Sequence, residues 1–114
     1  MKKKDKIVNN GIRLIITLTI CVTAFLLINA VNTYQHEQVH YKINEYIGIE
    51  SKISYSLLML GGKVTPTDNQ TISQDKEDYY FSMHTLNEII GYNVQSVLYA
   101  LMIITGLLIW RELK

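Results

Sequence analysis

The chain has 114 residues, which leaves room for one domain at most. Its 11 basic and 10 acidic residues give a net charge of +1, and no basic patch with interleaved aromatic residues occurs, which argues against a nucleic-acid partner. The single cysteine, Cys21, lies in an apolar run, so an internal disulfide is excluded and a packing role is expected.

The hydrophobic residues gather in two blocks near the chain ends. The first, Leu14 to Val31, has eighteen residues without a charge, just long enough to span a bilayer as a helix. A tail with four lysines precedes it, as in a secretory signal, for which a cleavage site after Ala24 is conceivable. We favour an uncleaved anchor, because the run is longer than a usual signal core, no A-x-A site closes it, and a second span follows.

The second block, Val94 to Trp110, has seventeen residues and ends in a tryptophan that suits the membrane interface. Basic residues cluster at both chain ends, whereas the segment between the blocks has four lysines and eight acids. Because cytoplasmic segments are enriched in Lys and Arg, both termini are predicted to face the cytoplasm. The predicted fold is a mainly α protein of the cell membrane. It has cytoplasmic tails at 1–13 and 111–114, transmembrane helices at 14–31 and 94–110, and an extracytoplasmic domain at 32–93.

The extracytoplasmic segment begins without a helix breaker, so one long helix is expected to leave the membrane and continue to Ile47. Gly48 is a natural C-terminal stop for it. The apolar residues of this part form a stripe of Val39, Ile43, Tyr46 and Ile47.

Residues 49–60 alternate between apolar and polar side chains, with Ile53, Tyr55 and Leu57 on one face, which predicts a strand. Tyr55 and the leucines after it are expected to form core or cleft wall. Gly61-Gly62 marks a turn, after which Val64-Thr65 is expected to return as a second short strand. A polar stretch, 67–78, contains an Asn-x-Thr sequon at Asn69. A final helix is predicted to start at Lys76 or Asp78 and to run straight into the second span.

The most informative motif is His36-Glu37-Gln38-Val39-His40, which reads H-E-x-x-H. Residues four apart share one face of a helix, so the two imidazoles can hold one metal ion while the carboxylate reaches a bound water. This is the ligand spacing of zinc hydrolases, in which the metal lowers the pKa of water and the Glu takes its proton. Zn²⁺ is the expected cofactor, although several transition metals accept such ligands.

A zinc hydrolase needs a third protein ligand, and height above the membrane helps to choose it. At a rise of about 1.5 Å per residue, His36 and His40 stand roughly 7 and 13 Å above Val31. Glu88 stands about 9 Å up the other helix, between the two histidines, and is the favoured third ligand. His84, at about 15 Å, is the alternative ligand, or a catalytic donor to the oxyanion that forms when water attacks a carbonyl.

The H-E-x-x-H motif followed by Asn87-Glu88 resembles the gluzincin branch of the zincin metallopeptidases, which pair the motif with a downstream N-E-x-x whose Glu is the third ligand. The resemblance implies that His36, His40 and Glu88 bind zinc and that Glu37 is the general base and acid.

The order of a helix, Gly48 and an alternating strand is also similar to the zincins, in which such a strand lines the cleft and pairs with extended substrate. The placement beside a membrane helix is similar to membrane-embedded metalloproteases, including the site-two group, whose later aspartate motif this chain lacks. The chain also resembles a small archaeal-type family of two-span proteins with H-E-x-x-H and a later H-x-x-x-E, here His84 to Glu88.

Two positions depart from the zincin pattern. Lys42 stands where the extended motif prefers an apolar residue, and Tyr92 stands where gluzincins usually place an Asp that orients a histidine. Asn44 or Asn87 is therefore a candidate to support the metal-binding histidines, since such partners tune metal sites.

The leading hypothesis is a membrane-anchored zinc metalloprotease that hydrolyses peptide bonds near the extracytoplasmic surface, with Glu37 activating zinc-bound water and His84 or a tyrosine steadying the oxyanion. A peptide or membrane-protein substrate would add to the strand at 49–57. Because the ectodomain is small, the bilayer, a homodimer or a larger partner is expected to complete the cleft. The alternative is a non-catalytic two-span subunit or partner-binding protein, with a structural or accidental metal site. Most tyrosines are expected to pack or to anchor at the interface.

Overall fold

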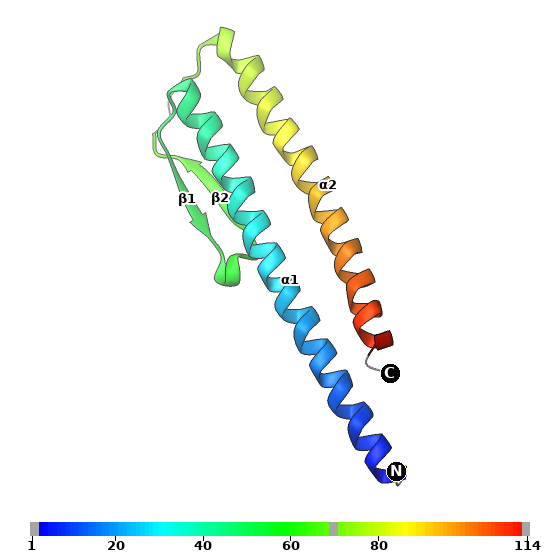
Figure 1. The fold of residues 1–114 in the computed structure, drawn as a ribbon. Coiled ribbons are helices and arrows are strands. Elements are labelled where there is room, and N and C mark those ends of the chain that lie inside the picture. Colours follow the sequence, from blue (N-terminus) through cyan, green and yellow to red (C-terminus); the bar gives the residue numbers. More distant parts are fainter. Residues whose placement is uncertain (1–2, 69–70, 113–114) are drawn as a thin grey trace.

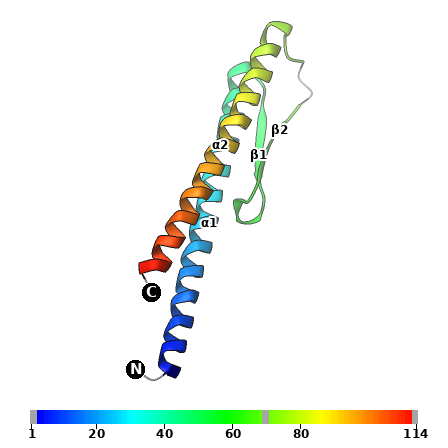
Figure 2. The ribbon, with the colours of Figure 1, turned by 90° about the vertical axis from the view of Figure 1, so that its right-hand side faces the viewer.

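The computed structural model describes residues 3–68 and 71–112, with side chains from residue 7 onward. Two long helices, α1 (Lys3–Ile47) and α2 (Gln74–Glu112), lie side by side and run in opposite directions (Figures 1 and 2). Between them in sequence come the strands β1 (Ser51–Tyr55) and β2 (Gly62–Pro66), joined through the short 3₁₀ helix η1 (Leu57–Met59). The molecule is a rod of 75 × 23 × 13 Å.

The two helices contain the two predicted spans. Both are long and apolar enough to cross a membrane, by length and composition. Large aliphatic side chains stay exposed along both helices, among them Ile15, Leu27 and Leu107. The prediction of a mainly helical chain with two long apolar helices and a small β-structure is confirmed.

The first helix is continuous from the apolar block through the H-E-x-x-H motif, as predicted, and ends at Ile47, directly before Gly48. Gly48 has a positive φ of 86°, a conformation that glycine adopts without a steric penalty. The N–H of Gly48 donates to the carbonyl of Glu45 at 3.1 Å, and the N–H of Ile49 donates to the carbonyl of Asn44 at 2.8 Å. These two bonds form a Schellman motif, which satisfies carbonyls at the helix end and turns the chain back along α1.

The predicted strand at 49–60 is shorter in the structure. Alternation holds from Ser51 to Tyr55, where the odd-numbered residues are less exposed, but the chain turns at Ser56. The turn is closed by two hydrogen bonds: the Ser56 N–H donates to the Gly61 carbonyl at 2.8 Å, and the Gly61 N–H donates to the Ser56 hydroxyl at 2.9 Å. The turn therefore precedes the predicted one, and Gly62 already belongs to β2. The sequence predicts that the leucines after Tyr55 form core or cleft wall. The core part is wrong, since Leu57 is 85% exposed, whereas Leu60 does line the cavity beside the candidate site.

The strands pair antiparallel, with Ile53 opposite Val64, and pack against α1. The small core contains Ile43, Ile47 and Ile49. The predicted stripe on α1 is thus only half right, because Val39 and Tyr46 are exposed. Tyr46 still meets α2 at its edge, where its ring lies 5.4 Å from the ring of Tyr79.

The second long helix starts slightly earlier than predicted, at Gln74, with Asp75 and Glu77 in its first turn, where acids suit the helix dipole. The sequon residue Asn69 lies outside the described residues. Cys21 lines an apolar cavity between the helices, and a Cβ on Gly106 would come within 2.9 Å of its sulfur. The packing role expected for Cys21 fits this position.

Candidate metal centre

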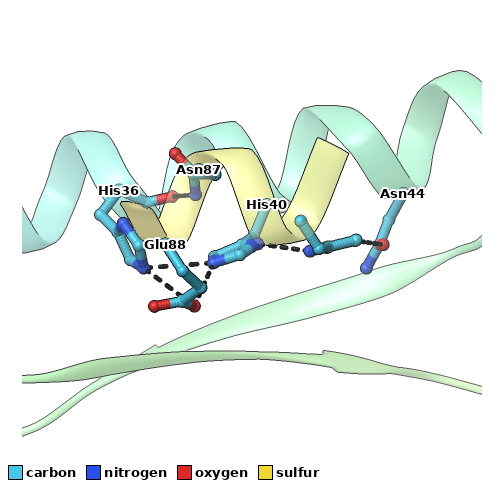
Figure 3. A network of polar contacts seen from close by, with 6 residues as sticks. His36, His40, Asn44, Asn87 and Glu88 are labelled. Atoms are coloured by element: carbon cyan, nitrogen blue, oxygen red, sulfur yellow. Dashed lines mark hydrogen bonds and ion pairs between the residues drawn. The ribbon is translucent and has the colours of Figure 1, made fainter. Parts of the chain in front are cut away.

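The two histidines of the motif lie one turn apart on α1 and point to the same side (Figure 3). Their Nε2 atoms are 3.1 Å apart, and their rings meet edge to face with centroids 4.6 Å apart. The i, i+4 spacing on a regular helix is sufficient to bring them together, which is why the sequence alone predicts the pair.

Glu88 approaches this pair from α2. Its Oε1 lies 3.0 Å from Nε2 of His40 and 3.4 Å from Nε2 of His36. The three side chains therefore offer one ligand atom each to a common point and could hold a metal ion. Two atoms that each lie 2.0–2.1 Å from a tetrahedral metal ion are about 3.3 Å apart, so the observed separations suit an ion of that size.

His84 lies one turn before Glu88 on α2 and contacts His40 and Asn44 of α1. Its Nδ1 contacts Nδ1 of His40 at 2.5 Å, and its Nε2 contacts the side-chain oxygen of Asn44 at 3.1 Å. Burial lowers the pKa of His84, and the nearby His40 lowers it further against an opposing effect of Glu88, so the neutral ring is favoured. Both ring nitrogens of His84 are thus engaged away from the ligand atoms.

With an ion in the centre, one set of tautomers would satisfy the chain of contacts from Asn44 to His40. The side-chain oxygen of Asn44 only accepts, so the proton of neutral His84 sits on Nε2 and donates to it. Nδ1 of His84 then accepts the Nδ1–H of His40. Nε2 of His40 is left with a free lone pair, directed at His36 and Glu88, which is the state that a metal ligand requires.

Asn87 holds α2 at a fixed position along α1 next to the ligand cluster. Its side-chain N–H donates to the backbone carbonyl of His36 at 3.1 Å, and the residue is buried. Gly91, one turn further along α2, permits close helix contact, because a Cβ there would stand 2.7 Å from Nδ1 of His36. Asn44 and Asn87 thus both support the centre, one through His84 and one through the backbone.

Glu37 lies on α1 beside the ligand cluster and is only 7% exposed. It lines two adjoining cavities of about 340 and 280 Å³, and Glu88 also lines both. A Cβ on Gly62 would come within 2.4 Å of its Cγ, so only glycine lets β2 pass this close. In the described part of the chain no side chain donates a hydrogen bond to the Glu37 carboxylate, which stands free beside the centre.

The strand that lines these cavities is β2, not the predicted one at 49–57. Gly62 and Val64 line the smaller cavity. Hydrogen-bonded and non-bonded pairs alternate along an antiparallel ladder, and the Thr67 N–H donates to the Glu50 carbonyl. By this alternation Gly62 and Val64 belong to non-bonded pairs, so their backbone N–H and C=O groups point to the free edge of β2.

One polar group near the site was missed at the sequence level. Asn29, buried within the apolar block of α1, accepts hydrogen bonds from the Tyr99 hydroxyl at 2.6 Å and from Gln95 at 3.2 Å. Gln95 also lines the larger cavity below the metal cluster. Polar residues inside an apolar run are a signal of such interhelical contacts, and Asn29 and Gln95 are visible as such in the sequence.

Comparisons with protein-family models, with curated proteins and with solved structures gave no match to this chain.

Proposed function

We propose that the chain is a membrane-anchored zinc metalloprotease that hydrolyses peptide bonds close to the extracytoplasmic membrane surface. The single observation that carries this proposal is the convergence of His36, His40 and Glu88, whose ligand atoms lie 3.0–3.4 Å apart. The H-E-x-x-H glutamate, Glu37, lines the cavities beside them.

Zinc held by three protein ligands keeps a fourth position for water and lowers the pKa of that water to about 7. Glu37 is well placed to accept a proton from the attacking water and to return it to the leaving amine. The carbonyl oxygen that becomes negative needs a donor, and Tyr80 and Tyr92 each line one of the two cavities.

A catalytic centre explains the ligand set better than a structural one. Structural zinc sites are usually closed by four protein ligands, whereas catalytic sites use three and stay open. Among the described residues the cluster has three members. It also faces cavities large enough for part of a peptide, which a purely structural site between two helices does not need.

An extended peptide fits along the free edge of β2. The outward backbone groups of Gly62 and Val64 would pair with the substrate main chain as an added strand. Gly62 contacts Glu37, so a peptide bound there would lie with its backbone next to the proposed base.

The membrane assignment rests on the two long apolar helices and on the distribution of charge. With the basic ends in the cytoplasm, the two histidine ligands stand on α1 roughly 7 and 13 Å outside the apolar block. Substrates would therefore be peptides or membrane proteins cut near that surface.

His84 is assigned as a positioning residue that holds His40 in its ligating tautomer, with Asn44 as its anchor. Replacing Asn44 by alanine is expected to lower zinc affinity about 10–100-fold, the usual cost of losing an outer partner. Asn44→Asp, which keeps an acceptor oxygen toward His84, should retain most of the affinity. Competition with a zinc-binding dye measures the zinc affinity of the two Asn44 variants. Asn93→Ala is the matched control, because it removes a side-chain hydrogen bond to a backbone carbonyl within α2. Equal affinities of Asn44→Ala and wild type would contradict this role.

The proposal as a whole is tested with the full-length protein in vesicles and a proteome-derived peptide library, read by mass spectrometry. We expect new peptide ends that disappear when a zinc chelator is added and return when zinc is restored. Zinc-loaded protein that produces no new ends would leave a non-catalytic two-span protein as the better reading.

A further inference from the structure

The hairpin tip, residues 57–60, presents an apolar surface that the described residues leave exposed. It reads Leu57-Leu58-Met59-Leu60, and the three leucines are 85%, 59% and 52% exposed. Adjacent exposed leucines on a small protein mark a surface that meets a partner or a membrane.

The backbone of the tip is also unusual for such residues. Leu58 and Met59 have positive φ values of 59° and 51°. This left-handed region is normally occupied by Gly, Asn or Asp in turns, and large side chains adopt it at an energetic cost. A polar turn would fold more easily, so folding alone does not account for the leucines.

The position of the tip along the rod indicates its partner. The hairpin runs back from Gly48 beside α1, and its tip lies toward the apolar parts of both helices (Figures 1 and 2). Leu60 and Gly61 line the same cavity as Asn32 and Thr33, which directly follow the apolar block ending at Val31. The tip therefore lies beside α1, at the level where the apolar block of that helix ends.

We infer that the hairpin tip inserts its leucines into the outer interfacial layer of the lipid bilayer. This rests on the membrane-spanning arrangement of the proposed function. Lys63, exposed on β2 a short distance above the tip, would then meet the lipid phosphates.

The contact would support the catalytic cleft. A two-stranded hairpin is only marginally stable by itself, and in the part of the chain that the structure describes the buried apolar side chains are those of Ile43, Ile47 and Ile49. Anchoring the tip in lipid holds β2 in place, and with it Gly62 against Glu37. The bilayer thus completes a cleft that the small ectodomain cannot build alone.

Depth-dependent fluorescence quenching tests this inference. The only cysteine, Cys21, is replaced by serine, and single cysteines are placed at Leu58, at Lys52 on β1 and at Leu101 in the apolar block of α2. Each full-length variant carries an environment-sensitive label in phosphatidylcholine vesicles with bromine either near the headgroup or deep in the acyl chains. We expect severalfold stronger quenching of label at Leu58→Cys than at Lys52→Cys, chiefly by shallow bromine, and deep quenching at Leu101→Cys.

Quenching at Leu58→Cys that is no stronger than at Lys52→Cys, with Leu101→Cys quenched, would overturn the inference and leave the spans intact. Absence of quenching at Leu101→Cys would instead remove the membrane-spanning arrangement, and the inference with it.

Discussion

Glu37→Gln is expected to abolish peptide hydrolysis while the protein keeps its zinc. Glu37 is not one of the three converging ligands, but its carboxylate lines both cavities beside them. The amide cannot take a proton from water, and losing a general base typically costs about 10²–10⁴ in rate. Glutamine is the right replacement because Gly62 lies so close to the side chain that a change in its size would disturb β2.

The measurement pairs the rate of cleavage of a peptide from the library with zinc content by elemental analysis. Glu45→Gln is the matched control, since Glu45 lies on the same helix and its exposed side chain pairs with Lys42, away from the ligand cluster. Full activity of Glu37→Gln would exclude Glu37 as the base, and loss of zinc from this variant would make Glu37 a ligand.

Glu88→Gln is expected to weaken zinc binding by more than about 100-fold, beyond the range for an outer partner. The carboxylate supplies the only anionic ligand atom of the described cluster and the only one from α2. Glutamine keeps the size of the side chain but removes the charge that favours the cation. Zinc affinity is measured by dye competition, with Glu77→Gln, an exposed acid in the first turn of α2, as control.

The same experiment separates the two candidate third ligands. If His84→Ala removes zinc while Glu88→Gln binds it normally, His84 is the ligand and the positioning role assigned to it is wrong. The contacts of His84 with His40 and Asn44 lead us to expect a smaller loss for His84→Ala than for Glu88→Gln.

The parts of the fold that follow from local rules could be predicted from the sequence. The two charge-free runs predicted the two long helices, and Gly48 predicted the end of the first one. Because the rise of a helix is constant, counting residues from the apolar edges placed Glu88 at the level of the two histidines. Its contacts with both rings agree with that count.

The rest depends on how the helices rotate and pack, which residue spacing does not encode. The contact of His84 with His40 requires α2 to present one particular face to α1. The strand predicted to line the cleft was 49–57, but β2 lines it. Which strand does so depends on where the chain reverses, and the turn at Ser56 could not be predicted because the alternating pattern continues to Leu57. The close approach of Gly62 to Glu37 appears only once the hairpin folds back on α1.

The most direct test of the metal centre is the metal content of full-length protein purified without chelators. Wild type is compared with the double variant His36→Ala/His40→Ala, and circular dichroism verifies that both keep their helices. We predict one zinc per chain in the wild type and none in the double variant. Wild-type protein without stoichiometric metal, or equal metal in both proteins, would contradict the account.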